Sequence, residues 1–399
     1  MKPRILMSLP QMPQDPASGA ARTAQTALEM AVEAGFEARA LGTTATERAG
    51  HADPVQYLRG ICPDLRTTSA SAGHFREFHF TQRGVAYSLL DTGRFGVTKW
   101  EKTHGRQYDR LFDDALNDFA PDILFTYGGL SGDVRRMRRA RSRHCRIAFC
   151  VFNLAYMNPD FFRETDAVLT PSEFLANHYR ERAGVESTPL PTPLDLGDVL
   201  ATGEREPIFV TMVNPSHEKG LFLFARLAEE LGKREPEIAV LAIEARGSAG
   251  GLVRAGAMGG FDLRRHESIM IAPPVPSPRD IYQNARVLVA PSVVEEASGR
   301  VVAEALVNGV PPVVSDRGGL AESCNGAGFV VPLPSDYTMR TMRPVSAEAV
   351  EPWIEIIRKL CFDEPFYQDA VSKAREAGKM YLRQCLQPRY ANFFKTLLR

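Results

Sequence analysis

The sequence lacks several features that would place it in a particular class of protein. Its six cysteines are scattered, without a CxxC pair or histidines at ligand spacing, so neither a disulfide framework nor a zinc site is expected. We find no apolar run long enough to span a membrane and no signal peptide. The 48 basic and 48 acidic residues cancel, which gives no general reason to expect nucleic-acid binding. These absences favour a globular protein of the cytoplasm with reduced thiols.

What is present is the pattern of an α/β protein with two domains. A chain of 399 residues is too long for one ordinary core. Short apolar runs alternate with helical stretches in the first half, which predicts a parallel sheet with crossover helices and an added hairpin over 75–90. The predicted strands of this half are 4–9, 37–41, 122–126, 146–151 and 167–170.

The same alternation restarts after a proline-rich segment, 188–207. It predicts a helix over 221–231, a glycine-rich loop over 246–260, and strands at 208–213, 238–243, 268–271, 286–290 and 312–315. We therefore expect two doubly wound, Rossmann-like domains with a ligand cleft between them. The expected boundaries are an N-terminal domain of 1–190, a linker of 191–206, a C-terminal domain of 207–375, and a C-terminal helix, 376–399, that packs back on the first domain.

Two glutamates stand eight residues apart in the stretch Pro291–Gly309. Glu296 lies in a loop that opens a helix, and Glu304 falls on the second turn of that helix, which ends at Gly309. Free backbone N–H groups at the helix start attract phosphate, and carboxylates accept hydrogen bonds from sugar hydroxyls. Such a site suits a ligand that is part phosphate and part carbohydrate, although two glutamates at this spacing are often merely solvated.

Two further loops follow predicted strands of the second half. In VNPSHEKG, Val213–Gly220, Lys219 stands just before a helix, where its ammonium can meet a phosphate held by backbone N–H groups. In SDRGGLAE, Ser315–Glu322, a glycine pair allows the backbone to approach a ligand closely. Lys219 could instead be an ordinary surface lysine, and the glycine pair could instead form a plain tight turn.

Together these three segments resemble the C-terminal domain of the retaining glycosyltransferases of family 4, which have the GT-B fold. The family's E-x7-E matches Glu296 to Glu304, and its GGxxE matches Gly318–Glu322. Its flanking PSxxExxG and EAxxxGxP pattern is present as Pro291-Ser292, Gly299 and Glu304–Pro311, and its GR-x4-KG is matched in part by Val213–Gly220. The resemblance covers roughly residues 208–335.

The resemblance implies a UDP- or GDP-linked sugar bound by the second domain. Glu296 and Lys219 would be catalytic, with Glu296 on the hydroxyls of the transferred hexose and Lys219 on the diphosphate, while Glu304 would bind the ribose. The other implied donor-binding residues are Asn214, His217, Gly220, Arg246, Ala297, Ser298, Gly299 and Arg300. Gly19 and Tyr127 would lie on the acceptor or diphosphate side.

The sequence departs from the family pattern at two positions. Asn214 replaces the arginine that binds the diphosphate, so a bidentate cation is missing from the leaving group. Arg300, Arg317 or Arg246 could replace it, and sequence does not choose among them. Tyr127 stands where many members have a histidine, and only Gly19 remains of the usual N-terminal glycine pair.

The chain also lacks an Asp-x-Asp triplet, the carboxylate pair that holds Mg²⁺ or Mn²⁺ in the other main glycosyltransferase fold. Metal-independent transfer without a cofactor is therefore expected, with the charge of the diphosphate met by Lys219, an arginine and helix N-termini. The resemblance implies that no protein nucleophile forms a covalent intermediate and that the acceptor attacks on the face the nucleotide leaves.

Seven arginines occur within Arg135–Arg146, RRMRRARSRHCR. This arginine content indicates either a solvated basic face or a surface in peripheral contact with an anionic membrane. The acceptor, a sugar, a lipid or a small molecule, is expected on residues 1–190, with the 75–90 hairpin and Trp100–Arg106 as walls. The alternative functions are a nucleotide-sugar 2-epimerase and a catalytically weak sugar-nucleotide-binding subunit.

Overall fold

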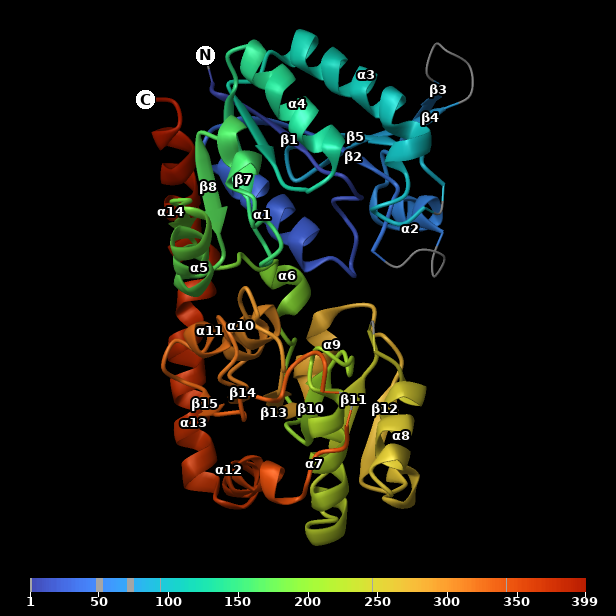
Figure 1. Cartoon of the computed structure of the whole chain (residues 1–399), viewed down its shortest axis with the longest axis vertical. Coiled ribbons are helices and arrows are strands. Elements are labelled where there is room, and N and C mark those ends of the chain that lie inside the picture. Colours follow the sequence, from blue (N-terminus) through green and yellow to red (C-terminus); the bar gives the residue numbers. More distant parts are fainter. Residues whose placement is uncertain (1, 48–52, 70–74, 94, 246, 342) are drawn as a thin grey trace. The chain divides into compact units, whose positions relative to one another are not determined.

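The computed structural model divides the chain into two compact units, which we describe separately (Figure 1). The structure describes residues 2–47, 53–69, 75–93, 95–245, 247–341 and 343–399. The first unit comprises Met1–Pro171, Leu175–Pro193 and Arg383–Arg399. The second comprises Ser172–Phe174 and Leu194–Leu382.

The sheet of the first unit has nine strands in the order β3-β4-β5-β2-β1-β6-β7-β8-β9. All neighbours pair in parallel except β3 with β4 and β4 with β5, which form the predicted hairpin and its edge. The strands are β1 Arg4–Ser8, β2 Glu37–Thr43, β3 Arg66–Ser69, β4 Arg76–Gln82, β5 Val85–Leu90, β6 Ile123–Thr126, β7 Arg146–Cys150, β8 Ala167–Thr170 and β9 Thr188–Pro189. The helices are α1 Gly19–Glu33, α2 Pro54–Ile61, α3 Glu101–Phe119, α4 Ser131–Ser142, η1 Pro159–Glu164, α5 Glu173–Ala183 and α14 Arg383–Thr396.

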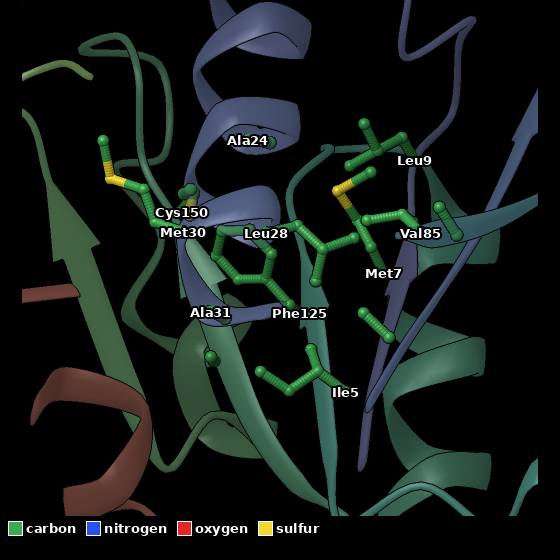
Figure 2. Close-up of a cluster of buried hydrophobic side chains, with 14 of the residues drawn as sticks. Ile5, Met7, Leu9, Ala24, Leu28, Met30, Ala31, Val85, Phe125 and Cys150 are labelled. Atoms are coloured by element: carbon green, nitrogen blue, oxygen red, sulfur yellow. The ribbon is translucent and has the colours of Figure 1, made fainter. Parts of the chain in front are cut away.

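The two faces of this sheet are covered by different helices because strand residues alternate in direction. Ile5 and Met7 of β1 lie in a buried apolar cluster with Leu28 of α1 and Phe125 of β6 (Figure 2). The next residue of the strand, Ser8, points to the other face, where its Oγ lies 3.0 Å from the Tyr108 Oη of α3. The period-two pattern that predicted β1 thus also positions α1 and α3.

The C-terminal helix α14 belongs to the first unit although the chain reaches it last. Tyr390 and Phe394 are fully buried in the cluster that contains α1, and the Tyr390 Oη donates to the Pro191 carbonyl at 3.0 Å. At the start of the helix, Arg383 pairs with Glu33 of α1 at 2.8 Å. These contacts explain why the last residues group with the first unit and not with the chain that precedes them.

The second unit has six parallel strands in the order β12-β11-β10-β13-β14-β15. They are β10 Phe209–Val213, β11 Val240–Ile243, β12 Ile269–Ala272, β13 Ala285–Ala290, β14 Pro312–Ser315 and β15 Phe329–Val331. The helices are α6 Leu196–Val199, α7 Leu221–Arg234, α8 Ala249–Met258, η2 Leu263–Arg265, α9 Pro278–Asn284, α10 Arg300–Val307, α11 Leu320–Ser323, η3 Glu348–Val350, α12 Glu351–Phe362, α13 Glu364–Gly378 and η4 Lys379–Tyr381. The strand order reverses between β10 and β13, and ligands of such sheets bind at this reversal, beyond the carboxyl ends of the strands.

The expectation of a loop over 246–260 is wrong, because 249–258 forms α8. Ser248 caps the helix by accepting from the Gly251 N–H at 3.2 Å, and Leu252 and Ala255 are buried. Glycine content favoured a loop, but burial of an apolar face outweighs the propensity cost of about 1 kcal/mol for each helical glycine. Gly256 also leaves room for Phe261, since a Cβ at this position would lie 3.2 Å from the phenyl ring.

Most of the arginine-rich segment lies in α4, which packs beside α3 (Figure 1), and its last residue, Arg146, begins β7. Its arginines contact carboxylates or amides at intervals of about one helical turn: Arg136 with Asp109, Arg139 with Asp113, and Arg143 with Asn117. Arg138 pairs with Glu164 at 2.9 Å, and both Arg141 and Arg146 pair with Asp166. The predicted basic face is therefore matched by acidic groups of the same unit.

Candidate functional site

Three loops of the second unit leave the same edge of its sheet around the strand reversal. They follow β10, β13 and β14, and they carry the three segments singled out from the sequence. The loop after β10 ends at Gly220, the loop after β13 ends at Gly299, and the loop after β14 ends at Gly319. Because β13 lies between β10 and β14 in the sheet, the glutamate loop is the middle one of the three.

Lys219 and Glu296 form an ion pair between the loop after β10 and the loop after β13. The Lys219 Nζ lies 2.5 Å from the Glu296 Oε1, and the Ser292 Oγ donates to the same oxygen at 2.6 Å. The two side chains are 28% and 14% exposed, so the pair is oriented but reachable from solvent. Among the described residues no hydrogen bond is found on the Glu296 Oε2, which leaves that oxygen able to accept from a ligand hydroxyl.

Glycines in these loops allow backbone to lie directly on backbone. Gly318 has φ +61°, and a Cβ there would be 2.4 Å from the Glu296 carbonyl oxygen. Gly319 donates its N–H to the same carbonyl at 2.8 Å. Gly220, with φ +89°, would place a Cβ 2.0 Å from the Pro291 carbonyl oxygen. The glycine pair therefore holds the glutamate loop closely, whereas the sequence had suggested a close approach to a ligand or a plain turn.

Glu304 belongs to a separate hydrogen-bonded group. Its Oε2 accepts from the Tyr282 Oη at 3.0 Å, and its Oε1 accepts from the Arg300 Nε at 2.9 Å. The residue is 5% exposed. Burial, and then the charge of Glu304, raise the pKa of Tyr282 well above its ordinary value, so the phenol stays protonated and donates. Any ribose hydroxyl would share this carboxylate with two protein donors.

The helix start at α10 differs from the expectation of free N–H groups. The Gly299 N–H donates to the Ser323 Oγ at 2.7 Å, so this group is already satisfied within the protein. Ala297 and Ser298 lie in the same loop, half-buried, between Glu296 and the helix. The structure thus corrects the expectation of free N–H groups at Gly299, because this donor fixes the loop.

Asn214 has the left-handed conformation, with φ +64°, and is 8% exposed. Its Oδ1 accepts from the Gly247 N–H at 2.8 Å, which ties the loop after β10 to the loop after β11. Asparagine tolerates this backbone region better than most residues. The residue that departs from the family pattern thus has a structural task of its own.

We expect both Asn214→Ala and Asn214→Arg to lower the free energy of unfolding, by about 1–3 kcal/mol, because each places a non-Gly, non-Asn residue at positive φ and leaves the Gly247 N–H without its acceptor. Asn214→Arg is also expected not to raise turnover, since a longer side chain cannot keep the Gly247 bond. Urea denaturation and steady-state kinetics measure the two effects. Asn214→Gly, which relieves the backbone, is the control and should cost less than Asn214→Ala.

His217 holds the segment between β15 and η3. Its Nε2 lies 2.6 Å from the Met339 carbonyl oxygen, and its ring packs edge-on against Phe222 with centroids 5.8 Å apart. The His217 Nδ1 and the neighbouring Ser216 Oγ are buried and have no hydrogen-bond partner within the described chain. Two unsatisfied polar atoms beside Lys219 are consistent with a loop that binds a polar ligand.

The arginines considered as replacements for the missing cation have other partners. Arg317 donates to the Pro334 carbonyl at 2.7 Å and to the Leu333 carbonyl at 3.2 Å. Arg300 pairs with Glu304. Arg246 lies outside the described residues. Lys219 is therefore the cation that the described structure brings next to Glu296.

Gly19 and Tyr127 are placed in the first unit. Gly19 is the first residue of α1, and Tyr127 follows β6 directly, 7% exposed and edge-on to Phe152. Trp100, expected on the acceptor wall, is fully buried and packs on Tyr108 with ring centroids 5.2 Å apart. Trp100 itself cannot line such a wall, since the indole is a core group, and the rest of the segment Trp100–Arg106 stays a prediction.

The three loops lie in a segment that matches a known family of proteins. Residues 205–341 match the family model described as glycosyl transferases group 1, and this range contains Asn214, Lys219, Glu296, Glu304 and the glycine pair. This part of the second unit is therefore similar to the glycosyl transferases of group 1. No curated protein matches its sequence. The GT-B fold expected from the sequence is confirmed by solved structures of the same fold.

Three of those structures illustrate how similar the fold is despite low sequence identity. Sucrose-phosphate synthase from Thermosynechococcus elongatus has a TM-score of 0.70 and 15% identity, covering 100% of this chain and 99% of that one. A glycosyltransferase from Rickettsia africae has a TM-score of 0.68 and 14% identity, with the same coverage. HepE from Anabaena in complex with UDP-glucose has a TM-score of 0.66 and 12% identity, covering 98% and 99%.

Sequence reasoning missed three side chains that fix the two glutamates and the start of α10. They are Ser292, Tyr282 and Ser323, which contact Glu296, Glu304 and Gly299. Ser292 is four residues before Glu296, a spacing that allows a local contact, whereas the other two lie some twenty residues from their partners. Among the described residues no group of three or more His, Cys, Asp or Glu side chains could hold a metal ion. No helix of the described chain is long and apolar enough to cross a membrane.

Proposed function

We propose that the chain is a retaining glycosyltransferase that moves a hexose-type sugar from a UDP- or GDP-linked donor to an acceptor hydroxyl without a metal ion. The observation that carries the proposal is the Lys219–Glu296–Ser292 group, which presents a fixed carboxylate and an ammonium at the strand reversal of the second unit. Sugar hydroxyls are donors and diphosphates are anions, so the pair is complementary to both ends of a nucleotide sugar.

In this proposal each group has one task. Glu296 accepts from hydroxyls of the transferred sugar through its Oε2, and Lys219 balances the charge that develops on the diphosphate. The bond between the anomeric carbon and the phosphate oxygen breaks with its electron pair going to the phosphate. The acceptor oxygen bonds to the anomeric carbon on the same face, and its proton passes to the departing phosphate oxygen.

A double displacement with a protein nucleophile is the mechanism that the proposal excludes. Retaining hydrolases of that kind set two carboxylates about 5–5.5 Å apart around the scissile bond. Here Glu304 is held by Tyr282 and Arg300 in its own buried group, which suits a role at the ribose and not at the anomeric carbon. Glu296 is therefore the one carboxylate of the pair assigned to the sugar.

The test is a reaction of the purified chain with a panel of UDP- and GDP-hexoses, analysed by NMR for the anomeric configuration of the product. We expect a sugar moved off the nucleotide with its configuration retained, at an unchanged rate in EDTA. The presence of UDP-glucose in the HepE structure makes this donor the first to try. An inverted product, or activity that is lost in EDTA and restored by Mn²⁺, would contradict the proposal.

The same panel separates the alternative functions. A 2-epimerase would leave the sugar on the nucleotide and change its configuration, whereas a binding subunit would give neither product nor donor hydrolysis. Membrane contact through Arg135–Arg146 receives no support from the side-chain geometry, because these arginines face Asp109, Asp113, Glu164 and Asp166. A membrane is therefore not part of the proposed function.

A further inference from the structure

Three loops of the first unit meet at the reversal of its own strand order, which lies between β1 and β6. β1 pairs with β2 on one side and with β6 on the other, so the residues after Ser8, Thr43 and Thr126 leave the sheet together. The Met12 N–H donates to the Ala45 carbonyl at 2.8 Å, and the Thr126 Oγ1 donates to the Ser8 carbonyl at 2.6 Å. Ligands of α/β sheets bind beyond the carboxyl ends of strands at such a point.

Two carboxylates are fixed where these loops meet. Asp15 is 2% exposed, and its oxygens accept from the Ala17 N–H at 3.0 Å and the Glu47 N–H at 2.8 Å. The Glu47 Oε1 accepts from the Ser18 Oγ at 2.7 Å, and Ser18 is the N-cap of α1. The start of α1, which attracts negative charge, therefore already has carboxylates of the protein itself beside it.

Three buried polar atoms of the same loops have no hydrogen-bond partner within the described chain. They are the Tyr127 Oη, the Gln11 Nε2 and the Gln14 Oε1, on residues that are 7%, 3% and 4% exposed. Burial, followed by the charges of Glu47 and Asp15, raises the pKa of Tyr127 well above its ordinary value, so both carboxylates act on the phenol. Buried polar atoms without partners are rare, and several beside a strand reversal point to a ligand that completes them.

The charge of the loops limits what that ligand can be. The described residues of 9–18, 44–47 and 127–130 include Asp15 and Glu47 and no lysine or arginine. A phosphate or carboxylate group would meet like charge here, whereas hydroxyl groups could donate to the carboxylates and to the Gln14 amide oxygen. The Tyr127 Oη and the Gln11 amide can donate to the oxygens of the same hydroxyls.

We infer that Asp15, Glu47, Tyr127, Gln11 and Gln14 form an acceptor subsite that selects an uncharged, hydroxyl-rich group and disfavours a phosphorylated one. The inference rests on the proposed function, because it names the acceptor class of the same transfer. Tyr127, which departs from the family's histidine, is then a specificity residue of this subsite.

The test compares an uncharged glucose derivative with a phosphorylated glucose. Saturation-transfer NMR on the full chain with UDP present measures binding of methyl α-D-glucoside and of glucose 6-phosphate. We expect saturation by the glucoside and a Kd for the phosphorylated sugar at least about tenfold higher. Glu47→Gln and Tyr127→Phe should each raise the Kd for the glucoside, by about three- to tenfold. Glu37→Gln, at the opposite end of β2 and half-exposed, is the matched control and should leave both values unchanged.

Tighter binding of glucose 6-phosphate, no saturation by the glucoside, or variants that behave as Glu37→Gln would each overturn the inference. Donor hydrolysis, measured on the same protein preparations with UDP- and GDP-hexoses in place of UDP, reports separately on the proposed function. If UDP- and GDP-sugars are left intact while the glucoside still binds through Glu47, the proposed function fails and the subsite stands. If donors are hydrolysed and the glucoside does not bind, the subsite fails alone.

Discussion

Glu296→Ala is expected to lower the kcat of sugar transfer roughly 10²–10³-fold, which is the usual cost of removing one fixed polar group from a transition state. The Ser292 hydroxyl and the Lys219 ammonium together orient this carboxylate before any substrate arrives. Its loss removes the group proposed to accept from the sugar hydroxyls, and it removes the ion-pair partner of Lys219. Because the proposed ribose contact is made by Glu304, the Kd for the free nucleotide should change less than about threefold. Steady-state kinetics and calorimetric titration of the nucleotide measure the two values.

Two controls separate this role from a general effect of the loop. Glu295→Ala removes an exposed carboxylate one residue away and should keep near-normal turnover. Ser292→Ala removes one of the two hydrogen bonds on the Glu296 Oε1, so its turnover should fall between the other two variants. Thermal melting of all three establishes that the fold is retained. Near-normal turnover in Glu296→Ala would show that the assignment is wrong.

The sequence predicted most of the second unit because its strands are continuous apolar runs. Val287 and Val289 face one buried cluster, whereas Leu288 and Ala290 face the other, so both sides of β13 had to be apolar. α8 was missed because its glycines resemble a loop, and only the packing of Leu252 and Ala255 against the rest of the core reverses that preference. Local composition did not contain this information.

The sequence pointed to individual residues of the site, but it did not show which of them contact one another. Lys219 and Glu296 were singled out from different segments, and the ion pair between them depends on a strand order that places β10 beside β13. The glycine pair was singled out for an approach to a ligand, whereas the clash of a Cβ with the Glu296 backbone is visible only in three dimensions. Asn214 likewise has its partner, Gly247, in a different loop.

The arginine-rich helix α4 is another case in which contacts between separate segments could not be predicted from the sequence. Seven arginines suggested a surface, whereas several of their partners lie on α3. The sequence does show one sign of these partners: Asp109, Asp113 and Asn117 are spaced four residues apart and so lie on one face of a helix. What sequence could not show is that α3 and α4 pack beside each other.

Arg136→Ala is expected to lower the free energy of unfolding by about 3–5 kcal/mol, because it leaves the buried Asp133 carboxylate without its cation. The Arg136 side chain is 3% exposed and donates to Asp109 and to Asp133 at 2.8 Å each, while its guanidinium lies 4.9 Å from the centre of the Tyr108 ring. Asp133 in turn accepts from the Leu130 N–H at 2.9 Å, which fixes the loop after Tyr127. Urea denaturation measures the loss. Arg139→Ala, three residues on and 41% exposed, is the control and should cost about 0–1 kcal/mol.

The pH dependence of this variant distinguishes a lost charge pair from a simple cavity. Burial raises the pKa of Asp133 above its ordinary 3.8, and Arg136 opposes that rise. Without Arg136 the folded carboxyl should bind its proton still more tightly than the unfolded one, so the variant gains stability as pH falls from neutral towards the raised pKa. The difference from the wild-type protein should therefore be smaller at about pH 5 than at about pH 8. A difference that is independent of pH would mean that Arg136 acts through packing on Tyr108 alone, and an Arg136→Ala cost no larger than that of Arg139→Ala would contradict the buried network altogether.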